Sequence, residues 1–187
     1  LAERVARLAP LRVLEVACGT GIVTRRMLEK LPAGATLTAT DLNQPMLDHA
    51  QRSLVADARV TWRTADAMAL PFDDASFDTY VCQFGFMFFP DKLVAAREAR
   101  RVLERGGRLL ISTWDRIENN AFARVANETI ASFFPSDPPA FYRTPFGWYD
   151  EGEIRRTLEA AGFRDLRIKT VPREGSSVSA RDFATGL

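Results

Sequence analysis

An apolar segment that runs directly into a glycine-rich turn most constrains how this chain can fold. Residues 13–21 read Val-Leu-Glu-Val-Ala-Cys-Gly-Thr-Gly, and a helical pattern follows at 20–31. Gly19 and Gly21 let the backbone bend tightly and approach a ligand closely, while the first turn of the next helix offers unpaired N–H donors. This strand, turn and helix predict a nucleotide-type site at the carboxyl end of the first strand of a parallel sheet.

The turn departs from two common phosphate-binding patterns. A dinucleotide fingerprint requires a third glycine at position 24, where this chain has Thr24, and does not place Glu15 inside the strand. A phosphate-binding loop requires Gly-Lys-Ser/Thr, whereas Gly21 is followed by Ile22 and Val23. The sequence therefore argues against NAD and against a phosphate-binding loop, while a purely structural strand-to-helix turn stays open.

Short β-type segments alternate with amphipathic helical patterns along the rest of the chain. This alternation predicts an α/β fold with a doubly wound, mostly parallel sheet. The expected strands are 11–16, 35–40, 58–63, 77–83, 108–114 and 163–171. The expected helices are 20–31, 44–56, 91–104, 120–134, 150–161 and 179–187. A chain of 187 residues has the size of one domain.

The composition excludes several classes of protein. Lys and Arg number 25 against 24 Asp and Glu, so the net charge of +1 gives no electrostatic reason to expect nucleic acid or an anionic membrane as partner. Cys18, Cys82 and His49 are too few for a Cys/His metal cluster, and the apolar runs are too short to span a membrane. We expect a cytoplasmic protein that uses an organic cofactor and no metal.

Two carboxylates follow the second and third expected strands. Asp41 lies about 20 residues beyond the glycine turn, where it can accept hydrogen bonds from both hydroxyls of a ribose. Asp66 lies just past the third strand, within reach of an adenine amino group. A helix N-cap is the plainer alternative for Asp41, although Asn43 is the better N-cap, and a turn is the plainer alternative for Asp66.

Together these elements resemble the class I S-adenosylmethionine-dependent methyltransferases, and among them the ubiquinone and menaquinone biosynthesis C-methyltransferases. The resemblance covers about residues 11–114 and rests on segments 13–21, 41, 66–67, 70–78 and 101–107. It implies a Rossmann-like sheet whose last family strand, antiparallel and beside the fifth, is missing from this chain. The chain is then expected to be an incomplete domain with an exposed edge on the fifth strand.

The resemblance also implies a site for S-adenosylmethionine, with S-adenosylhomocysteine as the product. Glu15 would meet the ammonium group of the methionine part through water or backbone, and Asp41 would hold the ribose. Ala17 stands where the family most often has glycine, a mild change if its φ is negative. The implied cofactor-binding residues are Glu15, Ala17, Gly19, Gly21, Asp41, Leu42, Met46, Asp66, Ala67, Gln83 and Phe84.

Aromatic residues indicate where a methyl acceptor would bind. Nine of the chain's 19 lie from Trp114 to Asp150, which favours a small, apolar or aromatic acceptor. We expect residues 1–187 to form one methyltransferase domain, with 11–114 binding the cofactor and 115–187 covering the acceptor. Four side chains are expected to border the acceptor: Phe86, Phe141, Tyr142 and Trp148. Core packing is the alternative for aromatic rings in this region.

The expected reaction is transfer of a methyl group by in-line displacement, for which no catalytic residue can be assigned. His49 is expected on a helix surface, and the arginines between Arg97 and Arg108 on a solvated helix face. Two alternatives stay open: a non-catalytic domain that binds S-adenosylmethionine or S-adenosylhomocysteine, and a nicotinamide-dependent Rossmann enzyme. The oligomeric state is also open.

Overall fold

The computed structural model describes residues 1–54, 56–134, 136–137, 139–179 and 181–182. These residues form a five-stranded sheet in the order β3-β2-β1-β4-β5, in which every neighbouring pair is parallel. The strands are β1 (Arg12–Val16), β2 (Thr36–Asp41), β3 (Val60–Thr64), β4 (Phe77–Gln83) and β5 (Leu103–Ser112). The predicted α/β class and doubly wound parallel sheet are confirmed.

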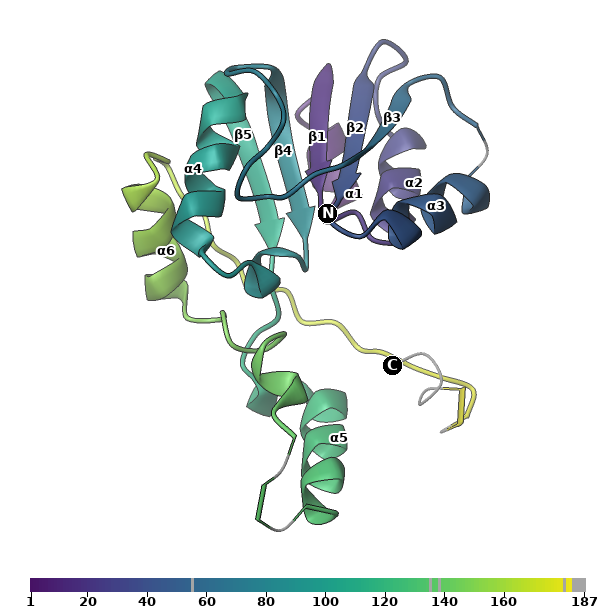
Figure 1. Cartoon of the computed structure of the whole chain (residues 1–187), viewed down its shortest axis with the longest axis vertical. Coiled ribbons are helices and arrows are strands. Elements are labelled where there is room, and N and C mark those ends of the chain that lie inside the picture. Colours follow the sequence, from purple (N-terminus) through teal and green to yellow (C-terminus); the bar gives the residue numbers. More distant parts are fainter. Residues whose placement is uncertain (55, 135, 138, 180, 183–187) are drawn as a thin grey trace.

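Helices cover both faces of the sheet (Figure 1). On one face lie α1 (Ala2–Ala6), α2 (Ile22–Leu28) and α3 (Gln44–Ser53). The other face is covered by α4 (Lys92–Val102) and α6 (Glu151–Ala160). A further helix, α5 (Ala121–Ser132), projects away from the sheet beyond its carboxyl edge (Figure 1). Short 3-10 turns occur at η1 (Phe86–Phe88), η2 (Ile117–Asn119) and η3 (Phe141–Arg143).

The strand β1 shows why both faces need a cover. Val13 packs among the residues of α1 and α2, whereas Leu14 and Val16 pack in the cluster that includes α4 and α6. Successive side chains of a strand point to opposite faces, and all three are buried because helices cover both faces. A parallel strand that is buried on both faces has a nearly continuous apolar sequence, as Val13, Leu14 and Val16 show.

The strand order sets the place of a ligand site. From β1 the chain proceeds through β2 and β3 in one direction, and then returns to β4 and β5 on the other side of β1. The connections that leave β1 and β4 therefore part from each other at the carboxyl ends of these strands. Ligands of open α/β sheets bind at such a switch point. All five strands point toward this edge, below which α5 projects (Figure 1).

The expected strand at 163–171 is wrong. Phe163 is buried and Leu166 and Ile168 are half-buried against the core, so the alternation in the sequence is real. Asp165, however, has a left-handed φ of 55°, and the segment pairs with no strand in the described part of the chain. β5 lies at an edge of the sheet, as expected. Most of the helix expected at 179–187 lies outside the described residues.

The other boundaries shift by a few residues. The largest shift is at the start of β5, which begins at Leu103 instead of residue 108, because Leu103 already pairs with Phe77. The register then shifts between Phe77 and Thr79, where Gly106 takes a φ of 84°. Throughout the residues placed by the structure, no helix is both long and apolar enough to cross a membrane.

Candidate functional site

The glycine turn rests on the end of β2. The Cys18 amide donates to the carbonyl of Thr40 at 3.0 Å, and the Gly19 amide donates to Oδ2 of Asp41 at 2.8 Å. Gly19 and Gly21 have φ values of 55° and 78°, a region that favours glycine. A Cβ at Gly19 would point into open space, whereas a Cβ at Gly21 would lie 3.0 Å from Ala50 of α3. The turn is therefore open on the ligand side and closed against the protein.

Asp41 fixes this turn through both carboxylate oxygens. Oδ2 accepts from Gly19, and Oδ1 accepts from the amide of Asn43 at 2.9 Å. Asn43 occupies the N-cap position of α3, so the plainer N-cap reading of Asp41 does not hold. The side chain is half-buried at the carboxyl end of β2. Each oxygen keeps a further lone pair that can accept a bond from a ligand.

Two apolar side chains lie exposed beside Asp41. Leu42 is 70% exposed, and Met46, in the first turn of α3, is 41% exposed. Leu47 in the next position is 1% exposed, which shows how completely α3 buries its inner face. Leu42 and Met46 thus present apolar surface near the carboxyl end of β2, and their contact with an adenine stays a prediction.

Glu15 is a buried carboxyl group beneath the turn. It is 2% exposed on the α2 face of β1 and accepts a 2.6 Å hydrogen bond from the hydroxyl of Thr24. Burial raises its pKa to about 8, against the opposing effect of the Thr24 hydrogen bond, and the negative charge of Asp41 raises it further. Thr24, itself fully buried, was missed as a site residue, although its place at the position of the third glycine was a usable signal.

The ends of β1 and β4 carry unusual backbone conformations. Ala17 has a φ of 56° and Phe84 also has a φ of 56°, so the condition under which alanine at position 17 would be a mild change, a negative φ, is not met. A Cβ at Gly85 would lie 2.6 Å from the Cβ of Ala17 and 2.6 Å from the sulfur of Cys82. The side chain of Ala17 therefore fills the space that glycine leaves at position 85. Strained residues of this kind gather at functional sites.

The remaining predicted cofactor residues lie on the same carboxyl edge. Asp66 is half-buried and forms a turn, in which its Oδ1 accepts from the Met68 amide at 2.8 Å. Ala67 is buried beside it, and Gln83 ends β4 in register with Ser112 of β5. The turn role of Asp66, the plainer alternative, is therefore real, and contact with an adenine edge stays a prediction.

The four predicted acceptor residues separate into two pairs. Phe86 and Trp148 are 0% and 1% exposed, and their rings stack in the core with centroids 5.3 Å apart. Phe141 is 71% exposed and Tyr142 is half-buried, both on η3. Core packing, the alternative, thus describes Phe86 and Trp148, and these two do not border an open surface here. Phe141 and Tyr142 remain available to a ligand.

An aromatic chain that the sequence reading missed links η3 to the strand ends. Tyr142 lies 6.2 Å from Phe146, and Phe146 lies 5.8 Å from Trp114, measured between ring centroids. Trp114 in turn stacks on Phe84 at 4.3 Å with an interplanar angle of 9°. Aromatic pairs at such distances stabilise each other. The ring of Phe84, expected beside the methyl donor, therefore connects the carboxyl edge of the sheet with the aromatic region.

Three minor expectations can be placed. His49 is exposed on α3, as expected. Cys18 and Cys82 are both free and buried, and burial raises the pKa of the Cys82 thiol to about 12. Arg101 contradicts the expected solvated face, since its guanidinium binds several groups of the connection between β3 and β4. Among the residues that the structure describes, no group of three or more His, Cys, Asp or Glu side chains gathers as a metal site would need.

Comparisons with known proteins agree with this geometry. A family model described as a methyltransferase domain matches residues 14–111. A demethylmenaquinone methyltransferase of Mycolicibacterium gilvum is 32% identical over 170 residues, which are 86% of this chain and 71% of the relative. A ubiquinone/menaquinone biosynthesis C-methyltransferase of Ruegeria sp. is 37% identical over 117 residues, 61% of this chain and 46% of the relative.

The fold has solved counterparts. A SAM-dependent methyltransferase of Aquifex aeolicus superposes with a TM-score of 0.67 over 89% of this chain and 81% of that protein. Its sequence identity of 20% makes this a likeness of fold alone. The chain spans about half the length of several curated relatives that it matches, between 40% and 53%.

Proposed function

Since the chain belongs to the class I S-adenosylmethionine-dependent methyltransferases, we propose that it transfers the methyl group of S-adenosylmethionine to a small apolar or aromatic acceptor. The observation that carries this proposal is the pairing of Asp41 with the Gly19 amide. This pairing joins a carboxylate that is placed to bind a ribose to a glycine turn that is open on its ligand side. We assign residues 11–114 to cofactor binding and residues 115–187 to covering the acceptor.

The residues present fit this cofactor. Gly19 leaves space where a side chain would otherwise stand, and Asp41 keeps acceptor capacity toward that space. Leu42 and Met46 offer apolar contact for the adenine. Glu15 is a buried carboxyl group for which the described residues provide a hydroxyl partner and no salt bridge. A ligand with an ammonium group would supply the missing positive charge.

S-adenosylmethionine, when bound, supplies a methyl group that its sulfonium already activates. The chain's own residues then need to align the acceptor in line with the carbon–sulfur bond and to keep water away. Proximity and orientation can supply roughly 7 to 11 kcal/mol of such a barrier. The aromatic chain through Phe84, Trp114 and Phe146 provides an apolar wall beside the strand ends. No basic side chain is required for this alignment.

The aromatic region supports the class of acceptor. Phe141 and Tyr142 lie at the outer end of the aromatic chain, with their rings 5.2 Å apart and perpendicular. The names of the relatives describe methylation in quinone biosynthesis, which is in keeping with an aromatic acceptor. We therefore assign Phe141 and Tyr142 to the acceptor border.

Replacing both rings should weaken acceptor use and leave cofactor binding intact. We expect Phe141→Ala/Tyr142→Ala to lower kcat/KM for an aromatic acceptor about tenfold or more. Each aromatic contact that the bound acceptor buries is worth roughly 1–2 kcal/mol. Transfer of a radiolabelled methyl group to a demethylated quinone measures this. Phe133→Ala, an equally exposed ring at the end of α5, is the matched control. Equal losses in both variants would refute the assignment.

The same assay separates two classes of protein. A non-catalytic binding domain would bind S-adenosylmethionine and transfer no label to any acceptor. Trp148→Ala is unsuitable as a test of the acceptor border, because Trp148 is 1% exposed and the loss of its ring would destabilise the core.

A further inference from the structure

The connection between β3 and β4 is an irregular segment that carries Asp66 and Ala67. It crosses the sheet face toward α4 before β4 begins (Figure 1). An irregular segment has no ladder of backbone hydrogen bonds, so its position depends on individual contacts. The contacts that hold it decide where the carboxylate of Asp66 stands.

Arg101 of α4 uses all five of its guanidinium N–H groups, three toward this connection and two toward Glu98 on its own helix. Nη1 donates to the carbonyl of Phe72 at 2.7 Å and to Oδ1 of Asp74 at 2.9 Å. Nη2 donates to the carbonyl of Leu70 at 2.9 Å and to Oε2 of Glu98 at 2.8 Å, and Nε donates to Oε1 of Glu98 at 2.8 Å. Five donors thus meet five acceptors, a geometry that lysine cannot reproduce.

Glu98 also binds the backbone of Leu70. Its Oε2 also accepts from the Leu70 amide at 2.8 Å, so both backbone groups of Leu70 are bound by the Glu98–Arg101 pair. The Arg101 hydrogen bonds lower the pKa of Glu98, which keeps the pair charged. Side-chain exposures of 19% for Glu98 and 31% for Arg101 shelter the pair from most of the solvent. The carbonyl of Arg101 further accepts from the amide of Ala75 at 3.0 Å.

The other end of the same segment is tied to β2. The Ala65 amide donates to the carbonyl of Asp41 at 3.0 Å. Between this anchor and Leu70, the carbonyl of Asp66 accepts from the Ala69 amide at 3.0 Å, and Oδ1 of Asp66 accepts from the Met68 amide. The turn at Asp66 is therefore short, internally bonded and anchored at both ends, so we expect a displacement of Leu70 to move Asp66 as well.

We propose that the Glu98–Arg101 pair is a positioning device that holds the Asp66–Ala67 turn in place to recognise the amino group of adenine. This inference rests on the proposed function. Arg101 touches neither cofactor nor acceptor, and acts through the backbone of Leu70 and Phe72. The alternative is that the pair stabilises the fold alone. The two differ in one respect, because only a positioning role changes the selectivity between purine bases.

The test compares S-adenosylhomocysteine with S-inosylhomocysteine, in which a carbonyl replaces the adenine amino group. Calorimetric titration of the full chain, below the melting temperature of every variant, gives both dissociation constants. We expect the wild type to bind the adenosyl compound about tenfold more tightly, the value of one hydrogen bond. In Arg101→Met the ratio should fall toward unity, with little change for the inosyl compound. Arg101→Lys and Glu98→Gln should fall between, and they decide the matter if Arg101→Met does not fold.

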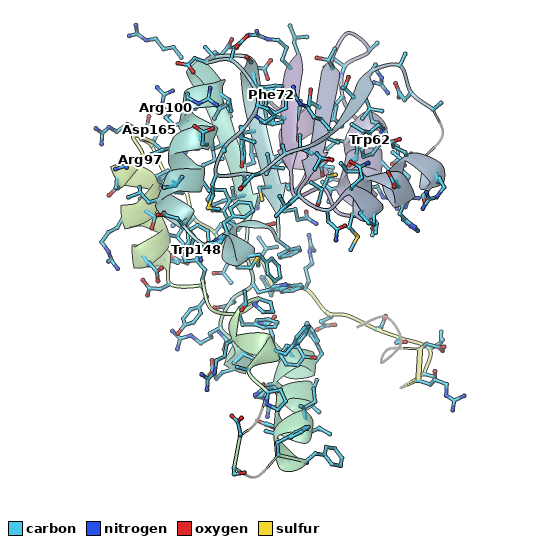
Figure 2. The ribbon with its side chains drawn as sticks, in the orientation of Figure 1. Trp62, Phe72, Arg97, Arg100, Trp148 and Asp165 are labelled. Carbon is cyan, nitrogen blue, oxygen red and sulfur yellow. The ribbon has the colours of Figure 1, made fainter. Side chains whose placement is uncertain are left out.

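Two controls complete the design. Arg97→Met removes an exposed arginine from the outer side of the same helix (Figure 2) and should leave the ratio unchanged. In an Asp66→Asn background, Arg101→Met should not lower the ratio further. If the Arg101 and Glu98 variants keep the wild-type ratio of the two dissociation constants, whatever their melting temperatures, the proposed function still stands and the positioning role is overturned. A wild type that binds both compounds equally overturns it as well, and one that binds neither overturns the proposed function with it.

Discussion

Asp41→Ala should weaken S-adenosylmethionine binding at least a hundredfold. The carboxylate is expected to accept two hydrogen bonds from the ribose, and hydrogen bonds to a charged group contribute about 1.5–3 kcal/mol each. The substitution also releases the Gly19 amide, which now donates to Oδ2 of Asp41 at 2.8 Å. Both losses act on the same ligand contact. Calorimetric titration of the variant with S-adenosylmethionine measures the change.

Asp41→Asn provides the graded control. It keeps one acceptor oxygen and the shape of the side chain, so its loss of affinity should lie between those of wild type and Asp41→Ala. Asp48→Ala, a change in a carboxylate that bonds to Gln44 on α3, should leave affinity unchanged. An Asp41→Ala variant that is folded and has the wild-type dissociation constant would show that the ribose contact is misplaced.

Glu15→Gln should remove a pH dependence of stability. The pKa of Glu15 is raised in the folded chain to about 8 from an ordinary value of 4.5, so folding favours the protonated group. The stabilisation is fully present below pH 4.5 and is lost as the pH rises through 8. We expect the free energy of unfolding of the wild type to fall by roughly 2–5 kcal/mol across this window relative to Glu15→Gln. Denaturant titrations at several pH values measure it.

The same group links protons to cofactor binding. A bound ammonium group would favour the ionised carboxylate, so the wild type should release close to one proton on binding S-adenosylmethionine at pH 7. Titrations in two buffers of different ionisation enthalpy measure this release. The charged neighbour is Asp41, and the Cys18 thiol also faces the group. Glu118→Gln, at an exposed site, is the control. Release that persists in Glu15→Gln would assign the proton to another group.

The sequence was sufficient to predict which residues gather at the carboxyl edge of the sheet, because the signals are local. Gly19 and Gly21 follow β1 and Asp41 ends β2, and parallel strands bring their carboxyl ends to one edge. The same reasoning could not foresee the left-handed φ of Ala17, whose Cβ occupies the space that glycine leaves at position 85, just after β4. Contacts between distant segments decide such details.

Packing between distant segments explains the remaining differences between the sequence-based predictions and the structure. Phe86 and Trp148 have the same residue types as an acceptor border, and only their packing against each other shows them to be core. Arg101 reads as one more surface arginine, until α4 is placed against Leu70 and Phe72. The segment 163–171 has the alternation of a strand but finds no partner strand among the described residues, which no pattern within the segment can reveal.

Calorimetric titration of the full chain with S-adenosylmethionine and, separately, with NAD tests the central claim most directly. The site described above predicts saturable binding of one S-adenosylmethionine per chain and no binding of NAD, because Thr24 replaces the third glycine of a dinucleotide turn and Glu15 lies beneath it. Binding of NAD without binding of S-adenosylmethionine would contradict the claim and would make the chain a nicotinamide-dependent protein.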